Sequence, residues 1–227
     1  MNYIFEFSDV LAAWPRLLTG LIYTAELTVA SIALGFFLGT VSAIVRHQKI
    51  RVLNTMVSVY VEILRNTPFL VQAFLVFFGL STLGLRLSAE LCAVLALTLN
   101  ASAYTCEIMR AGLDSVHRGQ VEAADAMGMS RPAIYWHILL LPATERVYPA
   151  LTSQFVLVML SSSITSQISA EELTGVANII QSETFRSFEV YLIIGVIYLA
   201  LSFVFRFAFW AIGLVIFPRK RLLGTSL

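Results

Sequence analysis

The sequence predicts an all-α membrane protein with about five transmembrane helices, and composition and hydropathy both carry this prediction. The chain has 227 residues, of which 58% are hydrophobic and only 13% are charged. Soluble domains carry about 25% charged residues, because their surfaces face water. The mean hydropathy is +0.82. We therefore expect one bundle of spanning helices that covers residues 1–227 as a single transmembrane domain.

Five apolar stretches are long enough to cross the membrane, since a span needs about 20 residues for about 30 Å of hydrocarbon. We place these spans at about residues 17–45, 67–85, 89–109, 148–168 and 190–217. The first stretch is too long for a signal peptide and follows an acidic N-terminus, so we expect it to remain as a helix. Residues 52–64 either lie at the membrane interface or extend the second span inward.

The distribution of basic residues predicts the orientation of the helices. Ten Lys and Arg residues fall on one side of the predicted spans and three on the other. The ten are Arg46, Lys49, Arg51, Arg110, Arg118, Arg131, Arg146, Arg219, Lys220 and Arg221, and the three are Arg16, Arg86 and Arg186. Because basic residues favour the cytoplasmic side, we expect the N-terminus outside, the C-terminus inside and an odd number of spans. The net charge of +1 indicates no nucleic-acid partner.

The long connection at residues 110–147 reads as short helices with defined ends. The sequence from Glu122 to Met127 favours a helix, and Gly128 suits the left-handed position just past a helix end. Ser130 can cap a second helix, with Pro132 in its first turn. The acidic and basic residues of this connection nearly balance. A compact cytoplasmic docking element is therefore expected here.

Three segments carry a family resemblance that spans about residues 15–217. The segment EAADAMG at 122–128, followed by Ile138 and Leu140, resembles the EAA signature of the permease subunits of bacterial ATP-binding-cassette importers. Pro142 comes one residue later than in that signature. The segments LRNTPFLVQ and AYTCEIMRAGLDSVHRGQ resemble the polar amino acid branch of the same family. They depart from the usual pattern at Asn66, Ala111 and His117.

The resemblance implies the five-helix core of a type I importer permease in the bacterial cytoplasmic (inner) membrane. The implied partners are two copies of an ATP-binding subunit, a second permease chain that is identical or similar, an external solute-binding protein and membrane lipid. The implied substrate is an amino acid, with a weak preference for a basic or polar one. The residues implied to couple the permease to the ATPase are Gly119, Glu122, Ala123, Ala124 and Gly128. The alternative for Glu122 is that it caps its own helix.

The chain itself is not expected to be an enzyme or to bind a cofactor. No G-x-x-x-x-G-K-[ST] phosphate-binding loop occurs in the sequence. If the family assignment holds, ATP and its magnesium ion bind to the separate ATPase subunit. His47, His117 and His137 have no metal-ligand spacing, so we expect no metal site.

Polar and ionisable residues within the spans are candidates for the substrate path, because a charged side chain at the bilayer centre costs about 2.5–3.5 kcal/mol on insertion scales. The candidates are Glu26, Asn100, Tyr104, Glu107, Gln154, Ser161, Ser163 and Thr165. Of these, Gln154, Ser161 and Thr165 are expected to form a polar stripe at helical spacing along the fourth span. The alternative is that these groups make hydrogen bonds between helices. Ser161 stands where the family often has a lysine. Arg206 has no partner in its own helix, and we expect it to pair with Glu26 or Glu107.

Three further residues stand at the inner start of the second span: Arg65, Thr67 and Pro68. They either start the helix, with Thr67 or Asn66 as its cap and Pro68 in its first turn, or contribute to a gate.

Two other classes of protein compete with the importer interpretation. An intramembrane enzyme needs a convergent set of His, Asp or Glu residues in the spans, and the sparse acidic residues do not supply one. An ion-driven carrier or a channel acts without an ATPase; such carriers often contain inverted repeats, and none is evident. ATP dependence of transport separates the carrier from the importer.

Overall fold

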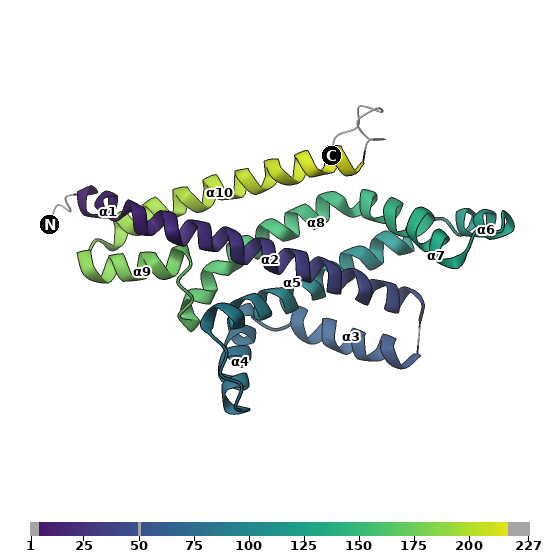
Figure 1. Ribbon diagram of the computed structural model, residues 1–227, viewed down its shortest axis with the longest axis horizontal. Helices are drawn as coiled ribbons and strands as arrows, with labels where there is room; N and C mark the ends of the chain where they lie inside the picture. Colours follow the sequence, from purple (N-terminus) through teal and green to yellow (C-terminus); the bar gives the residue numbers. More distant parts are fainter. Residues whose placement is uncertain (1–4, 50, 218–227) are drawn as a thin grey trace.

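The computed structural model describes residues 5–49 and 51–217, and all regular structure in these ranges is helical (Figure 1). In chain order the helices are α1 (Ser8–Ala12), α2 (Trp14–His47), α3 (Arg51–Arg65), α4 (Phe69–Thr82), α5 (Ala89–Asp114), α6 (Arg118–Ala126), α7 (Arg131–Ala133), η1 (Ile134–Leu140), α8 (Leu141–Ser161), η2 (Ser162–Ile168), α9 (Leu173–Thr184) and α10 (Ser187–Ile216). Helix η1 is a π-helix and η2 is a 3₁₀-helix. Helices α7, η1, α8 and η2 follow one another without a break.

Four helical stretches in the described ranges are long and apolar enough to cross a membrane: Trp14–His47, Ala89–Asp114, Arg131–Ile168 and Ser187–Ile216. A fifth crossing requires α3 and α4 together, and these two helices are bent by 111° relative to each other. Helix α4 alone has 14 residues, about 21 Å at about 1.5 Å per residue, which is shorter than the hydrocarbon layer. The all-helical membrane architecture is confirmed, with four spans or five.

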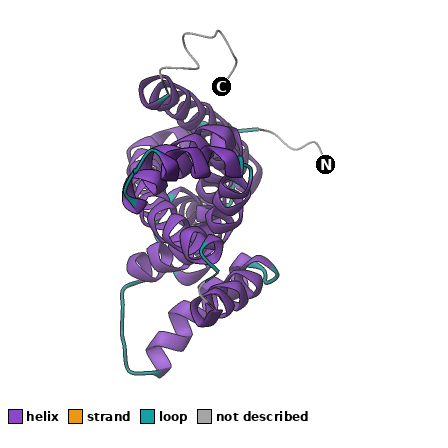
Figure 2. Ribbon diagram, turned by 90° about the vertical axis from the view of Figure 1, so that its right-hand side faces the viewer, coloured by secondary structure: helices purple, strands orange, loops and turns teal. Residues whose placement is uncertain are grey.

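Residues 52–64 do not extend the second span as one straight helix, because the chain turns sharply between α3 and α4. Helix α3 lies beside α5, whereas α4 leaves the bundle at a steep angle and is the lowest helix in Figures 1 and 2.

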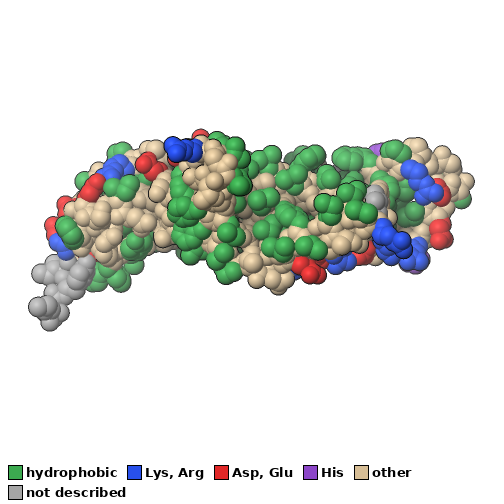
Figure 3. Space-filling view, turned by 90° about the horizontal axis from the view of Figure 1, so that it is seen from below, with side chains coloured by type: hydrophobic (Ala, Val, Ile, Leu, Met, Phe, Trp, Pro, Cys, Tyr) green, Lys and Arg blue, Asp and Glu red, His purple; other side chains and the backbone are tan. Residues whose placement is uncertain are grey.

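The surface between the two ends of the bundle is rich in apolar side chains (Figure 3). Along α10, for example, Val196, Phe203 and Val215 are each more than 60% exposed. In Figure 3 basic side chains gather near the right-hand end, where α6 and α7 lie in Figure 1. This pattern fits a bundle surrounded by lipid and neighbouring subunits.

Helices α2 and α5 make the closest contact in the bundle. Gly35 and Gly39, one turn apart on α2, face small residues of α5. A Cβ atom added to Gly35 would lie 2.7 Å from the Cβ of Ala101, and one added to Gly39 would lie 2.6 Å from the Cβ of Thr105. This close approach of two backbones is the usual way in which helices pack in a membrane.

Within the described ranges, the buried apolar residues form two hydrophobic clusters. The larger one surrounds α5 and includes Leu97, Met109 and Met159. The smaller one joins α1, α2, α9 and α10 at the opposite end from α6, through residues such as Leu17 and Leu173. We call these two ends of the bundle the α6 end and the α9 end.

We predict that Gly39→Ala destabilises the protein, because the added methyl group has no room against Thr105. Overpacking of this kind costs about 1–3 kcal/mol, which thermal unfolding of the purified protein in detergent will show as a lower midpoint. Gly195→Ala is the matched control, since no atom lies within 4 Å of a Cβ at this position of α10. Equal midpoints for the two variants would contradict the proposed close contact.

Candidate functional site

The connection between α5 and α8 forms a helical element at the α6 end. Helix α6 begins after His117, whose Nδ1 accepts a hydrogen bond of 3.1 Å from the backbone N–H of Gly119. Gly128 has a φ of +75° just past the helix end, which confirms the expected left-handed position. Ser130 occupies the N-cap position of α7, with Pro132 in the first turn, although the Ser130 side chain makes no capping hydrogen bond.

The EAA residues of α6 differ in their exposure. Glu122 and Ala123 are exposed, whereas Ala124 is only 1% exposed and packs against the rest of the chain. Ala124 therefore packs α6 against the rest of the chain, and the other two side chains lie on the surface. Sequence analysis missed two exposed apolar side chains of this element, Met127 at 74% and Trp136 at 63%. The sequence feature that could have identified both residues is a large apolar side chain within a connection that was expected to face water.

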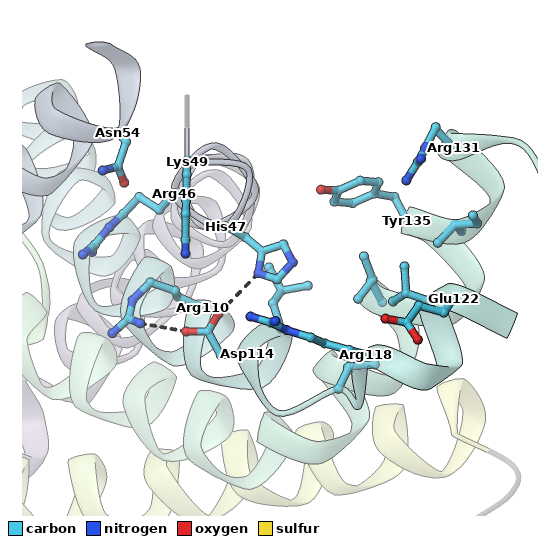
Figure 4. A pocket seen from close by; sticks show the side chains of 15 residues that line it. Arg46, His47, Lys49, Asn54, Arg110, Asp114, Arg118, Glu122, Arg131 and Tyr135 are labelled. Carbon is cyan, nitrogen blue, oxygen red and sulfur yellow. Dashed lines mark hydrogen bonds and ion pairs between the residues drawn. The ribbon is translucent and has the colours of Figure 1, made fainter. Parts of the chain in front are cut away.

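A cavity of about 950 Å³ lies between α6, η1 and the nearby ends of α2 and α5 (Figure 4). Its wall carries five basic side chains and two acidic ones; the basic ones are Arg46, Lys49, Arg110, Arg118 and Arg131, and the acidic ones are Asp114 and Glu122. In Figure 4, Asp114 lies between His47 and Arg110. Its carboxylate is 3.3 Å from Nδ1 of His47 and 2.8 Å from Nη1 of Arg110. The cavity thus places the EAA element beside the ends of two spanning helices.

Glu107 joins three basic side chains near the same ends of the helices. Its carboxylate pairs with Arg46 of α2, with Arg110 of α5 at 2.9 Å and with Arg65 of α3 at 3.7 Å. The side chains of Glu107 and Arg46 are only 19% and 17% exposed. Since an unpaired charge at such a site is costly, this cluster holds α2, α3 and α5 together.

The structure brings the candidates Asn100 and Tyr104 of α5 close to the residues at the bend between α3 and α4. On α5, Asn100 donates a hydrogen bond of 3.0 Å to the side-chain oxygen of Gln72, whose amide in turn donates to Thr67 at 3.0 Å. The guanidinium of Arg65 lies 5.5 Å from the centre of the Tyr104 ring. One face of α5 therefore contacts the bend between α3 and α4.

Two expectations about this bend were wrong. Pro68 is the N-cap residue of α4 rather than part of its first turn, and α4 has no side-chain cap. The Thr67 hydroxyl instead donates to the carbonyl of Ile63 at 2.8 Å, and the Asn66 side chain donates to the carbonyl of Glu62. Both side chains therefore bond to the last turn of α3. The extended backbone of Pro68 separates the two helices, which leaves these side chains nearer to the end of α3.

The polar stripe expected on the fourth span is broken by a change of helix type. Helix α8 ends at Ser161, and the following residues form the 3₁₀-helix η2. The hydroxyls of Ser163 and Thr165 donate to carbonyls three residues earlier, at 2.7 and 2.6 Å. Thr165 is fully buried, while Gln154 and Ser161 are partly exposed. The regular α-helical spacing assumed for the stripe is therefore wrong beyond Ser161.

Glu26 and Arg206 do not pair as expected. Glu26 is exposed on α2, and the basic partners of Glu107 are those named above. Arg206 is exposed on α10 and forms no ion pair with either carboxylate.

Sequence analysis also missed the role of Glu172, which is fully buried at the α9 end. Its carboxylate caps α9 by accepting from the backbone N–H of Gly175 at 2.9 Å, and it accepts from the Tyr198 hydroxyl at 2.5 Å. The Thr24 hydroxyl lies 3.5 Å from the same carboxylate. Burial raises the pKa of Glu172 because it disfavours the charged form. The sequence signal was an acidic residue directly before a helix.

Among residues 5–49 and 51–217, no group of three or more His, Cys, Asp or Glu side chains is placed to hold a metal ion.

Comparison with protein families matches residues 31–213 to the binding-protein-dependent transport system inner membrane components. The chain is 38% identical over 205 residues to the nopaline transport system permease protein NocM of Agrobacterium fabrum, covering 86% of this chain and 85% of the relative. It is 32% identical over 206 residues to the probable glutamine ABC transporter permease protein GlnP of Bacillus subtilis, covering 89% and 94%.

Two solved structures of ABC transporters contain chains that are similar to this one. A chain in the crystal structure of an amino acid ABC transporter with histidines superposes with a TM-score of 0.83 at 34% identity, covering 93% of this chain and 99% of the other. A chain of the inward-facing MetNI methionine ABC transporter has a TM-score of 0.77 at 20% identity, covering 90% and 98%, which shows a shared fold.

We predict that Glu107→Gln lowers the free energy of unfolding by about 1–3 kcal/mol, because it leaves partly buried guanidinium groups without their charge partner. The thermal unfolding midpoint measures the loss. Asp125→Asn is the control, since the Asp125–Arg131 pair is exposed and such pairs contribute little. An unchanged midpoint for Glu107→Gln would show that the cluster does not hold the helices.

We also predict a pH-dependent effect of Glu172→Gln. A carboxyl group whose pKa is raised by folding stabilises the protein below its unfolded pKa, near 4.5, and this contribution is lost as the pH rises through the raised value. The unfolding midpoint of the variant, measured relative to that of the wild type, should therefore increase from pH 4.5 toward pH 8.

Glu183→Gln is the control for this pH series. Hydrogen bonding to Arg16 lowers the pKa of Glu183, so its contribution is present above about pH 4.5 and is lost as the pH falls. Between pH 4.5 and pH 8 the difference for Glu183→Gln should therefore stay nearly constant, whereas that for Glu172→Gln increases. A difference in unfolding midpoint between Glu172→Gln and the wild type that does not change with pH would mean that folding does not raise the pKa of Glu172.

Proposed function

Because the chain belongs to the binding-protein-dependent transport system inner membrane components, we propose that it works as one of a pair of permease subunits that import an amino acid or an opine. The chain is a multi-pass inner-membrane permease of an ATP-binding-cassette importer, and its ATPase and solute-binding protein are separate partners. In the proposed assembly ATP and its magnesium ion bind to two copies of that ATPase. The pair consists of two copies of this chain, or of this chain and a similar one.

The exposed part of the α6 element is the proposed contact with the ATPase, and it carries the proposal. Glu122 and Ala123 are exposed on a helix that Ala124 packs against the bundle, Glu122 at the rim of the cavity, and Met127 adds an exposed apolar side chain to the same element. An exposed apolar patch with a charged rim is typical of a protein interface. Gly128 allows the left-handed turn after this helix, and Gly119 lies in its first turn, where its N–H donates to His117. We place the α6 end in the cytoplasm, in agreement with the basic residues gathered there.

Movement of α6 reaches the spanning helices through two connections. The cavity of Figure 4 places α6 beside the inner ends of α2 and α5. The Glu107 cluster then links those ends to Arg65 at the bend between α3 and α4. We propose that closure of the ATPases on ATP pulls the paired α6 elements together and opens the path outward, and that hydrolysis returns it to face inward. The bend with Arg65, Thr67 and Pro68 is the proposed gate.

The substrate proposal rests on the relatives. Their names specify nopaline, octopine, glutamine and cystine as transported solutes. Glu26 remains a proposed contact on the path, because it is exposed within a span. The proposed path residues Gln154 and Ser161 are at least partly exposed, whereas the hydroxyls of Ser163 and Thr165 are already bonded to the backbone. Asn100 and Tyr104 support the proposed gate through their contacts with the bend.

We predict that Glu122→Arg abolishes coupling, because it reverses the charge at the centre of the proposed contact. ATP-driven uptake by the complex of permease and ATPase in liposomes should fall at least about tenfold, as expected for the loss of an interface hot spot. The measurement is uptake of radiolabelled amino acid together with the amount of ATPase that co-purifies.

Gln120→Arg is the matched control, since Gln120 is exposed on the same helix but lies outside the EAA residues. It should leave uptake and co-purification nearly unchanged. Wild-type uptake that continues without an ATPase would overturn the importer and favour the carrier.

A further inference from the structure

Arg206 lies deep within the longest apolar stretch of α10. Nineteen residues of the helix precede it and ten follow it, which correspond to about 28 and 15 Å at about 1.5 Å per residue. Half of the hydrocarbon layer is about 15 Å thick. The whole helix is about 45 Å long and extends beyond the hydrocarbon layer, but Arg206 stands within its apolar stretch, and a charge within a span indicates a functional site.

The charge of Arg206 is not neutralised within the part of the chain that the structure describes. None of the ion pairs or side-chain hydrogen bonds of the described residues includes Arg206, although its side chain is exposed. Its counter-charge must then come from outside this fold. A solute, a neighbouring subunit and a lipid phosphate are the three sources.

The surroundings of Arg206 favour a small solute. Arg206 lines a cavity of about 250 Å³ between α8 and α10, with Tyr148, Pro149, Thr152, Ser153, Val156, Phe209 and Trp210. This volume equals that of about eight water molecules at about 30 Å³ each, which is the scale of one amino acid. The Tyr148 hydroxyl is already committed to the carbonyl of Phe209 at 2.6 Å.

The polar groups of this cavity complement an amino acid zwitterion. The five N–H donors of a guanidinium bind a carboxylate with two parallel hydrogen bonds. The Thr152 hydroxyl donates to the carbonyl of Pro149 at 3.0 Å, so its oxygen remains able to accept from an ammonium group. The exposed Ser153 hydroxyl offers a second acceptor. The indole of Trp210 and the ring of Phe209 supply apolar walls for a side chain.

We propose that Arg206 binds the α-carboxylate of the transported solute in the cavity between α8 and α10. This inference rests on the proposed function, which supplies a substrate of this chemical class. Arg206 thereby sets the requirement for a free carboxylate, while the two hydroxyls orient the ammonium group.

The test uses the whole complex, purified through the permease with its ATPase and binding protein. Radiolabelled L-glutamine, L-arginine, octopine and nopaline are the probes, and the one with the highest ATP-driven uptake by the wild type in liposomes is carried forward. Arg206→Met should lower its uptake by about tenfold or more, with unchanged co-purification of the ATPase, whereas Arg206→Lys should retain most of it. Phe203→Met is the matched control on α10, since Phe203 is exposed but does not line the cavity.

Binding without the binding protein then tests the carboxylate directly. The wild-type complex in detergent should bind the chosen probe about tenfold more tightly than the same compound with its α-carboxylate converted to an amide. This preference should disappear in Arg206→Met.

Each other outcome has a defined meaning. Uptake and binding by Arg206→Met at the wild-type level overturn the inference. Loss of the paired permease assembly in Arg206→Met, seen as a smaller complex by light scattering, assigns the counter-charge to a neighbouring subunit and also overturns it. Absence of ATP-driven uptake of every probe by the wild type refutes the proposed function itself, and with it the inference.

Discussion

The contact between α2 and α5 is the constraint on which the rest of the fold depends. Gly35 and Gly39 let the two backbones approach so closely that a methyl group would collide with Ala101 or Thr105. In a membrane, apolar side chains gain little by leaving lipid, so close packing of small residues replaces the hydrophobic effect as the force between helices. The same approach holds Arg46 of α2 beside Glu107 of α5, where the charged cluster forms.

The carboxyl groups of Glu107 and Glu172, near opposite ends of the bundle, are satisfied in different ways. At the α6 end, Glu107 and Asp114 are surrounded by arginine and histidine, and the pairs link separate helices. At the α9 end, Glu172 is buried among hydroxyl and backbone N–H groups instead. The first arrangement joins the helices that transmit movement in the proposed mechanism, and the second fixes α9 against α2 and α10 by hydrogen bonds without a basic partner.

Local signals in the sequence predicted more of this structure than long-range ones did. The helix end at Gly128 followed from the conformational freedom of one residue, and the apolar stretches followed from composition. The inward packing of Ala124 depends on the position of α6 against the bundle, which no local pattern contains. From the sequence, the Thr67 hydroxyl could bond either to the end of α3 or to the start of α4. The extended backbone at Pro68 determines that it bonds to α3. The partners of Glu107 come from helices distant in sequence, so their identity required the fold.

The π-helix η1 explains the late position of Pro142 within the EAA signature. A turn with i→i+5 hydrogen bonds accommodates one more residue than an α-helical turn does, and η1 lies directly before α8, in whose first turn Pro142 stands. One residue of an α-helix corresponds to a rotation of about 100° around the axis. The additional residue in η1 therefore sets the direction in which α6 points around the axis of α8. An insertion or deletion of one residue here would rotate the proposed coupling surface without altering any side chain on it.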